Sequence, residues 1–304
     1  MRKFLFINII ILFLSCISLF GQGGAPQDTS SNKLDKETIN LIMQTFDGQE
    51  IALIKLKVDQ LINSESDTLQ KGFIASTLFD YYYNSKYMGY EEVALYIADN
   101  YFLNKKLNWP NEEGFMMLKM FAEFNRQSMI GMPAPELALC DTLGKEISVL
   151  DEKGRYKIIY FYDDQCSKCN LYTARLMKFI QSTECGPITL FRVYTQDSRE
   201  RWTTYIKKLS KMFPEVGENV TIYDMWDPDL SSDFQKKYGV ISTPQMFLLD
   251  ENNIITGRKL DPAAVTQLVE MDYYKPTELE LFIDQLFTSI LPYDQTKEVD
   301  TTLV

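Results

Sequence analysis

The sequence predicts two kinds of structure in one chain: a small all-α domain, then an α/β fold in which helices flank a mixed central sheet. Over the first part of the mature chain, apolar residues recur every three or four positions, which is typical of helices that bury one face. After residue 131, short apolar runs alternate with helical patterns and end in a strand, a turn and a strand. That alternation indicates a sheet of mixed strand directions covered by helices.

The chain begins with the pattern of a secretory signal peptide, which we assign to residues 1–21. Arg2 and Lys3 precede an apolar stretch from Phe4 to Phe20, and small and polar residues follow it. Two alternatives stay open: the stretch could barely span a bilayer as an anchor, or Cys16 could belong to a faint lipoprotein cleavage site. We therefore expect an exported, periplasmic protein, held at the membrane only if the signal is retained or Cys16 is lipidated.

Charge and composition exclude several classes of function. The formal net charge of −11 becomes −13 if the two cations Arg2 and Lys3 leave with the signal, which argues against nucleic acid or an anionic membrane surface as a partner. The chain has no histidine, so mechanisms that need an imidazole base or a histidine metal ligand are unavailable. Of its five cysteines, the four beyond the signal are too few for a disulfide-built scaffold of this size.

The helical part is expected over residues 34–130, after a polar and turn-prone flexible lead at 22–33. We expect four or five helices, with breaks near Asp47-Gly48, Asn63-Ser64, Met88-Gly89 and Trp109-Pro110. Pro110 is expected at the first position of the last helix. Aromatic runs such as Tyr81 to Tyr83 are interpreted as core packing, and the domain as a support or a docking unit for a partner.

The α/β part is expected over residues 131–275, because the prolines of Gly131-Met132-Pro133-Ala134-Pro135 cannot continue a helix. It opens with a hairpin of two strands, 136–140 and 146–150. The elements expected next are strand 157–162, helix 166–181, strand 188–194, helix 198–212, strand 220–223, helix 229–238, and strands 245–250 and 254–260. Residues 276–304 are expected to form a C-terminal helix, docked on one domain or on a partner subunit, and a polar tail.

A C-x-x-C motif stands where the buried strand meets the next helix, at Cys166-Ser167-Lys168-Cys169. Two cysteines at this spacing on the first turn of a helix can close a small disulfide, and the helix N-terminus stabilises the thiolate of the first. Cys166 is therefore the candidate nucleophile. The same spacing also serves as a structural pair or as half of a zinc site, which would need Cys140 and Cys185 to converge with it. Those two cysteines are expected as buried free thiols, with partial exposure and a second disulfide between them as the alternatives.

The order of these elements, with C-x-x-C after the strand that follows the hairpin and Ile241-Ser242-Thr243-Pro244 before a later strand, resembles the thioredoxin superfamily. Residues 131–272 are most similar to the exported TlpA/ResA-type thiol-disulfide oxidoreductases. The resemblance implies a thioredoxin-like fold and disulfide exchange with protein dithiol or disulfide partners. It implies Cys169 as the resolving cysteine, the Cys166–Cys169 disulfide as the redox group with no other cofactor and no metal, and a cis Pro244 beside it.

The resemblance also implies a supporting set around the cysteines. Thr243 and Pro244 would present backbone to the bound substrate chain, and Lys168 or the helix N-terminus would stabilise the thiolate. However, Gln165 and Lys168 stand where members usually carry tryptophan and often proline, so we take both as support residues of altered character.

Acidic residues are missing from two places where relatives carry them, because this chain has Tyr160 and Tyr172 there. Asp163 and Asp164 are the candidate proton acceptors in their place, although adjacent carboxylates also raise a thiol pKa. The alternative is therefore a redox-inactive thioredoxin-fold binding or scaffold protein.

Two other functions are considered and set aside. Peroxiredoxins share this fold, but their P-x-x-x-[TS]-x-x-C motif would place proline at position 159 and Thr or Ser at 163, where this chain has Ile159 and Asp163. The acidic turn at Asp224, Asp227 and Asp229 could suggest calcium, yet a turn and a helix N-cap are the better interpretation.

Overall fold

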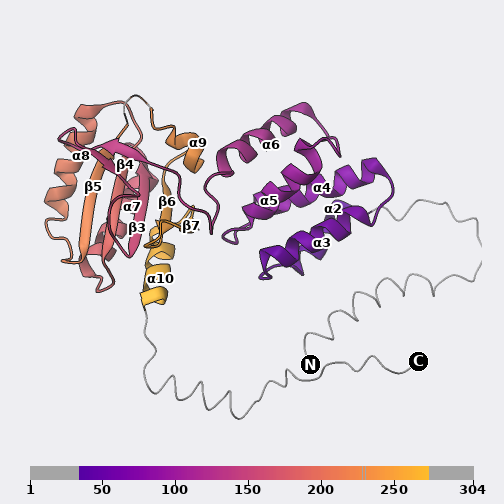
Figure 1. Ribbon diagram of the computed structural model, residues 1–304, viewed down its shortest axis with the longest axis horizontal. Coiled ribbons are helices and arrows are strands. Elements are labelled where there is room, and N and C mark those ends of the chain that lie inside the picture. Colours follow the sequence, from indigo (N-terminus) through magenta and orange to yellow (C-terminus); the bar gives the residue numbers. More distant parts are fainter. Residues whose placement is uncertain (1–33, 228, 230, 274–304) are drawn as a thin grey trace, which may run out of the picture. The chain divides into compact units, whose positions relative to one another are not determined.

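The computed structural model describes residues 34–227, 229 and 231–273 (Figure 1). The expected signal peptide, flexible lead and C-terminal helix lie outside these residues. The described residues from Lys36 onward form one compact unit. Within the described part of the chain, no helix is long and apolar enough to cross a membrane.

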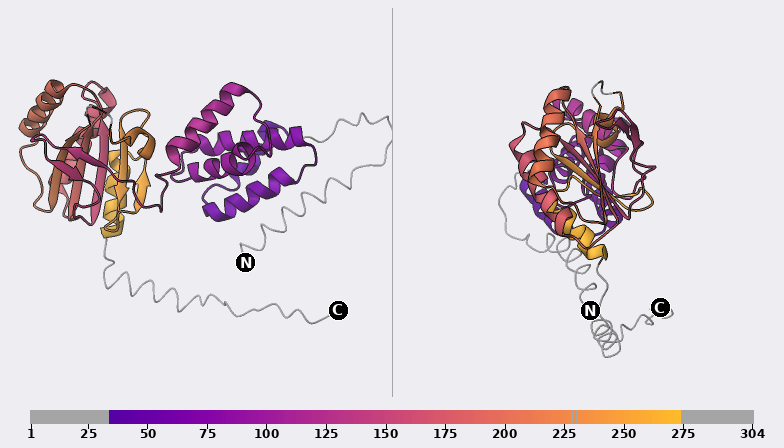
Figure 2. Two further views of the ribbon diagram at one scale, coloured as in Figure 1. Left: turned by 45° about the horizontal axis from the view of Figure 1, so that its top comes forward. Right: turned by 90° about the vertical axis from the view of Figure 1, so that its left-hand side faces the viewer.

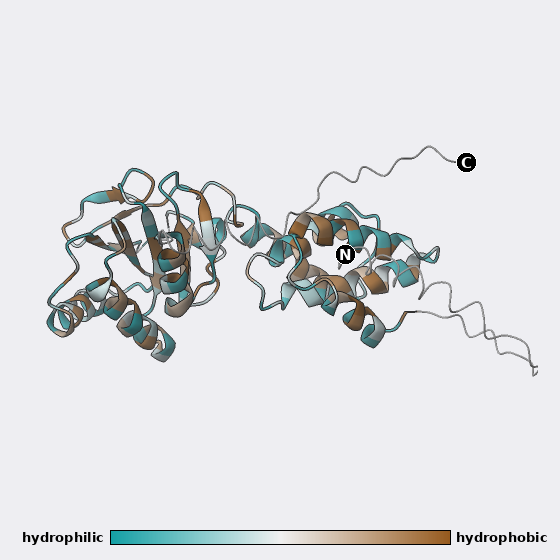
Figure 3. Ribbon diagram, turned by 90° about the horizontal axis from the view of Figure 1, so that it is seen from below, coloured by the Kyte–Doolittle hydropathy of each residue, from teal (hydrophilic) through white to brown (hydrophobic). Residues whose placement is uncertain are grey.

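The described chain begins with a group of helices. They are α2 (Lys36–Gln44), α3 (Ile51–Asn63), α4 (Thr68–Tyr83), α5 (Glu91–Ile97), which continues into the π-helical segment η1 (Ala98–Leu103), and α6 (Glu112–Asn125). All four expected breaks lie between these helices. The expectation for Pro110 is wrong, because α6 begins at Glu112 and Asn111 caps it by accepting a hydrogen bond from the Gly114 N–H at 2.7 Å. Figure 3 shows hydrophilic and hydrophobic residues alternating along the helices, as expected when one face is buried.

Seven strands of the described chain form one mixed sheet in the order β2-β1-β5-β4-β3-β6-β7. Their bounds are β1 (Ala138–Cys140), β2 (Glu146–Ser148), β3 (Tyr156–Tyr162), β4 (Ile188–Tyr194), β5 (Val220–Trp226), β6 (Gln245–Leu249) and β7 (Ile255–Arg258). The three central strands β3, β4 and β5 run parallel, whereas β6 and β7 and the β1–β2 hairpin pair antiparallel. Every residue of β3 and β4 is buried, which explains why apolar and aromatic residues dominate both strands, with Lys157 and Arg192 as the charged exceptions.

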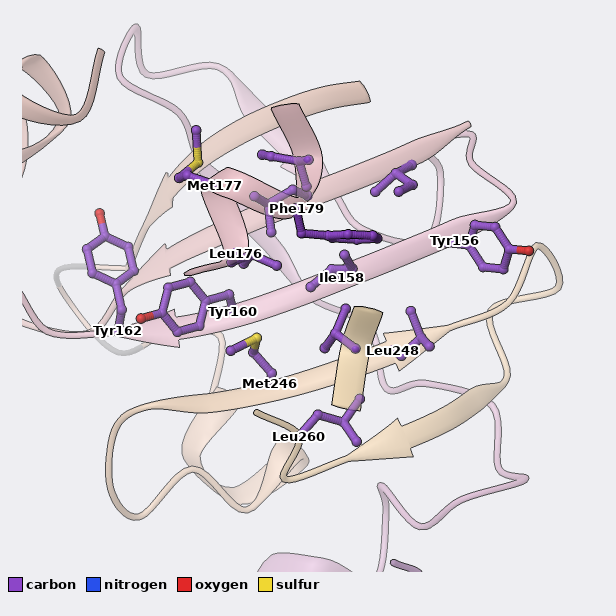
Figure 4. Packing of buried hydrophobic residues seen from close by; sticks show 14 of the residues in the cluster. Tyr156, Ile158, Tyr160, Tyr162, Leu176, Met177, Phe179, Met246, Leu248 and Leu260 are labelled. Atoms are coloured by element: carbon purple, nitrogen blue, oxygen red, sulfur yellow. The ribbon is translucent and has the colours of Figure 1, made fainter. Parts of the chain in front are cut away.

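Helices lie on both faces of this sheet (Figures 1 and 2). On one face, α7 (Ser167–Ser182), α8 (Arg199–Met212) and α10 (Pro262–Tyr273) pack in one core with alternate residues of β3, including Ile158 and Tyr160. Figure 4 shows α7 side chains such as Leu176 and Phe179 meeting Ile158 in this core. The intervening residues of β3 pack on the opposite face against α9 (Phe234–Tyr238) and the β1–β2 hairpin.

Two elements differ from their expected bounds by three residues or more. Strand β5 continues to Trp226, where the sequence indicated an end at 223. Helix α9 begins at Phe234 instead of 229, because the Asp227 carboxylate accepts backbone hydrogen bonds from Ser231 and Ser232 at 3.0 and 2.9 Å and forms a turn there. Asp227 therefore forms the expected turn, but it does not cap the helix. Helix α10 was not predicted.

A buried arginine joins the helical region to the edge of the sheet. The Arg258 side chain on β7 is 1% exposed, and its guanidinium donates a hydrogen bond to Asn125 Oδ1 of α6 at 2.6 Å and lies 3.4 Å from Glu91 Oε1 of α5. Burial lowers the pKa of Arg258, and the Glu91 carboxylate opposes that change. Nearby, Gly239 has a φ of +66° and an added Cβ would lie 2.5 Å from the Phe124 carbonyl oxygen, so only glycine fits where α9 approaches α6.

Candidate active site

Cys166 lies at the junction between β3 and α7, at the carboxyl end of a central strand. It is the N-cap residue of α7, with extended backbone, and its sulfur accepts a hydrogen bond from the Cys169 N–H at 3.1 Å. The positive end of the helix dipole therefore points at this sulfur, an arrangement that favours a thiolate. Cys166 is partly exposed and Cys169 is buried, so an incoming disulfide can reach only the first of the two.

The loop before β6 brings Thr243 and Pro244 to the cysteines from far along the chain. Strand β6 pairs antiparallel with β3, with Phe161 opposite Gln245, so the residues that precede β6 lie beside the residues that follow β3. The Thr243 carbonyl oxygen is 3.7 Å from Cys166 Sγ. The Thr243–Pro244 peptide bond is cis, as the family resemblance implies.

Cys169 lies beneath Cys166 in the core shared by α7 and β3. Its burial and its hydrogen bond with Cys166 raise the pKa of the Cys169 thiol to about 12, although hydrogen bonds with the Asp163 backbone and Thr243 offset part of the rise. The Tyr160 hydroxyl donates to the Cys169 carbonyl oxygen at 2.8 Å and lies 3.2 Å from Thr173 Oγ1. Tyr160 therefore holds the first turn of α7 against β3.

Comparison with known proteins agrees with this geometry. Residues 130–258 match the model of the AhpC/TSA family. These residues are therefore similar to the AhpC/TSA family, and because the solved structures below share their fold, they are called the thioredoxin-like domain. The curated protein "Sporulation thiol-disulfide oxidoreductase A" from Bacillus subtilis is 26% identical over 140 residues, which cover 45% of this chain and 78% of that protein.

Solved structures resemble both parts of the described chain. A thioredoxin-like protein from Bacteroides caccae is 12% identical with a TM-score of 0.53, covering 83% of this chain and 98% of that one, which supports the fold across helices and sheet. The thioredoxin domain of a thiol-disulfide oxidoreductase from Bacteroides vulgatus is 23% identical, with a TM-score of 0.41, covering 48% of this chain and 98% of that one.

The two candidate proton acceptors of the thioredoxin-like domain have unequal surroundings. Asp164 accepts hydrogen bonds from Tyr194 at 2.8 Å and from Arg201 Nε at 3.1 Å. Burial raises the pKa of Asp164, but these hydrogen bonds outweigh burial and the net change is downward. Asp163 accepts a hydrogen bond from the Gln165 N–H at 2.8 Å and lies 3.7 Å from the Arg201 guanidinium. The arrangement therefore argues against Asp164 as a proton acceptor and leaves Asp163 as the better candidate.

Gln165 and Lys168 are both exposed beside the cysteines. The Lys168 ammonium lies 5.2 Å from the centre of the Tyr172 ring one turn along α7. Among the described residues, neither side chain hydrogen-bonds to Cys166 or Cys169, so Lys168 acts on the thiolate only through space.

The other two cysteines of the thioredoxin-like domain lie apart from this site. Cys140 is exposed at the end of β1, and Cys185 is buried after α7. Both are free thiols, which corrects the expectation that Cys140 is buried. Among the described residues, no group of three cysteine or carboxylate side chains is placed to hold a metal ion.

Arg201 and the polar group around Tyr160 were not predicted from the sequence. Arg201 belongs to α8, and its side chain pairs with Asp163 and Asp164, which directly follow the central strand β3. Because these residues are far apart in the sequence, no local pattern predicts the contact. The Tyr205 hydroxyl, also on α8, hydrogen-bonds to Asn170 Oδ1 at 3.0 Å and to Thr173 Oγ1 at 3.3 Å. The sequence signal that could have indicated this polar group was Tyr160, which stands where relatives carry a buried acidic residue.

Proposed function

We propose that this protein is an exported thiol-disulfide oxidoreductase that exchanges disulfides with protein substrates through Cys166 and Cys169. The observation that carries the proposal is the position of Cys166 Sγ: partly exposed at the N-terminus of α7, 3.7 Å from the Thr243 carbonyl oxygen, with Cys169 directly beneath it. The family match and the relatives named as thiol-disulfide oxidoreductases support it.

In the first step, the Cys166 thiolate attacks one sulfur of a substrate disulfide. A bond forms between Cys166 and that sulfur, and the other substrate sulfur leaves as a thiolate and takes up a proton. The Cys169 N–H and the helix dipole stabilise the attacking thiolate before the reaction. Thr243 and Pro244 border the attacking sulfur, so their backbone is placed to align an extended substrate chain.

In the second step, Cys169 attacks Cys166 and releases the second substrate sulfur. The protein dithiol has then lost two electrons and two protons, and the substrate disulfide has become a dithiol; the reverse sequence oxidises the substrate. Burial first, and then the hydrogen bond with Cys166, raise the pKa of Cys169 to about 12, so this thiol is protonated at neutral pH and must give up its proton as it attacks. We propose Asp163 as the acceptor of its proton, directly or through water.

The proposal requires no redox group other than the Cys166–Cys169 disulfide, so electrons come from or go to another dithiol protein. Export rests on the N-terminal pattern of a charged start, an apolar stretch and small residues. A peroxidase is not proposed, since Ile159 and Asp163 occupy positions where that chemistry needs proline and a hydroxyl side chain.

The test is a thiol-disulfide redox titration of the full chain in which Cys140→Ser and Cys185→Ser leave only the proposed pair and Cys16. The number of alkylated thiols is read by mass shift across a series of defined potentials. We expect one reversible two-electron transition. It should vanish when either Cys166→Ser or Cys169→Ser is added, while a Cys16→Ser control should leave it unchanged.

A transition that persists without Cys166, or no transition between the potentials of known exchange proteins, would overturn the proposal. Either result would favour a binding protein on the thioredoxin fold.

A further inference from the structure

Helices α7 and α8 carry positive charge that contrasts with the rest of the chain. Helix α7 has three basic residues and no acidic one, a net charge of +3, and α8 has five basic residues and one acidic residue, a net charge of +4. Together they carry +7 in a chain whose formal net charge is −11. Positive charge is therefore concentrated on these two helices.

The two helices are neighbours on one face of the sheet. The Tyr205 hydroxyl of α8 hydrogen-bonds to Asn170 of α7, and Gln181 near the end of α7 donates to the carbonyl oxygen of Glu215 after α8. The exposed cations, here called the basic face, are Lys168, Arg175, Lys178, Arg199, Lys207, Lys208 and Lys211.

The cations of the basic face are not neutralised within the described protein. Among the eight basic residues of the two helices, Arg201 alone has a carboxylate within 4 Å in the described part of the chain. Arg201 pairs with Asp163 and Asp164, the acidic residues closest to the cysteines, and offsets one of their two charges. In the described part of the chain, Lys168, Arg175 and Lys178 of α7 therefore stay without a carboxylate within 4 Å.

The basic face begins at the dithiol. Lys168 stands between the two cysteines in the sequence, and Leu171, 48% exposed, follows it one turn along α7. On the other side of Cys166, Ile241 is 66% exposed two residues before Thr243. A polypeptide whose disulfide reaches Cys166 therefore meets apolar side chains at the sulfur and cations beyond them.

We propose that the basic face selects acidic polypeptide substrates, in which carboxylates flank the disulfide that reacts with Cys166. This inference rests on the proposed function and names its substrate class. Unpaired cations next to a reactive group raise the local concentration of a partner of opposite charge and speed its encounter. They also disfavour basic partners by like-charge repulsion.

The test measures single-turnover rates with three cyclic peptides that share one disulfide ring and differ only in flanking glutamate, serine or lysine. The full-length protein is reduced and freed of reductant beforehand, so its two thiols supply the two electrons and two protons that convert the peptide disulfide to a dithiol. Hydroxyethyl disulfide, which has no charge, measures the intrinsic reactivity of the dithiol.

At an ionic strength of about 0.01 M, where the Debye length is about 30 Å, we expect the glutamate peptide to react on the order of tenfold faster than the lysine peptide. At about 1 M, where the Debye length is about 3 Å, the two rates should converge. The variant Arg175→Gln/Lys178→Gln/Lys208→Gln should lose most of the preference and react normally with hydroxyethyl disulfide.

The matched control is Lys86→Gln/Lys105→Gln/Lys119→Gln, which removes three exposed positive charges from the helical region and should keep the preference. Equal rates for the three peptides, together with normal reaction of hydroxyethyl disulfide, would overturn the inference and leave the proposed function standing. An equal loss of the preference for the glutamate peptide in both triple variants would also overturn the inference. The net charge of the whole protein, and not the basic face, would then determine that preference. No reaction with hydroxyethyl disulfide would overturn the proposed function and the inference with it.

Discussion

Arg258 offers the sharpest test of how the helical region and the sheet depend on each other. The change Arg258→Met puts a long apolar side chain in place of an arginine side chain that is 1% exposed, and so removes a buried guanidinium. It leaves the Asn125 side-chain oxygen without its 2.6 Å donor and takes away the cation 3.4 Å from Glu91, whose side chain is 10% exposed. The buried amide oxygen would then lack its donor, and the buried carboxylate would lose the nearer of its two cations.

Removing one partner of a buried ion pair costs about 3–5 kcal/mol. The Lys259 ammonium stays 3.8 Å from Glu91 after the change, so we expect the lower end, about 3 kcal/mol. For a unit of this size, each kcal/mol shifts the melting temperature by about 2–4 °C, so the variant should melt roughly 6–12 °C lower.

The assay is equilibrium unfolding in urea, followed by tryptophan fluorescence and circular dichroism. The matched control is Arg155→Met, which removes the same charge from the exposed pair of Arg155 and Asp272, where the side chains are 38% and 63% exposed. That variant should lose much less stability, because exposed ion pairs contribute little. A loss at Arg258 no greater than at Arg155 would refute the reasoning that this contact couples the two regions. Adding Glu91→Gln to Arg258→Met should recover part of the loss, because it removes the stranded charge.

Three further predictions concern the site itself. The pKa of Cys169 is about 12, whereas a thiol in urea-unfolded protein has a pKa of about 8.5, so alkylation of Cys169 at pH 8 should be on the order of a thousandfold slower in the reduced folded protein. The alkylation rate should rise about tenfold per pH unit up to pH 11. Peptide mass mapping resolves this cysteine, and a pH-independent rate would contradict the prediction. The depressed pKa of Asp164 means that its pair with Arg201 stabilises the protein above the ordinary aspartate pKa of about 3.9 and is lost as the pH falls through the folded value. Asp164→Asn should therefore lessen the fall in urea midpoint between pH 7 and pH 3, and an unchanged acid dependence would argue against it. Tyr160→Phe keeps the buried ring but removes the hydrogen bond to the Cys169 carbonyl oxygen, so the urea midpoint should report a loss of about 1 kcal/mol; no loss would show that the hydroxyl does not hold α7.

The strands and helices next to the dithiol could be predicted closely from the sequence. Strand β4 has the predicted bounds, β3 begins one residue earlier than expected, and α7 begins one residue after Cys166 because Cys166 is its cap. These elements are either predominantly apolar runs or have helical spacing of apolar residues, so local sequence determines them. The prediction failed at α9 instead, where Asp227 forms a turn by accepting hydrogen bonds from Ser231 and Ser232.

The partners of the site residues depended on sheet order. Cys166 and Thr243 are 77 positions apart in the sequence, and they meet because β6 pairs with β3 in the register that sets Gln245 opposite Phe161. Arg201 reaches Asp164 because β4, which leads toward α8, lies next to β3. No window of neighbouring residues contains these adjacencies.

By itself, then, the sequence determined the alternation of strands and helices and the position of the C-x-x-C motif at a strand-to-helix junction, because both follow from the spacing of apolar residues along a local backbone. Only the tertiary structure decided that Arg201 pairs with the carboxylates beside the dithiol, which cysteine is buried, and that the basic helices α7 and α8 are neighbours. Burial and charge pairing depend on residues that are distant in the chain and become neighbours when the sheet assembles.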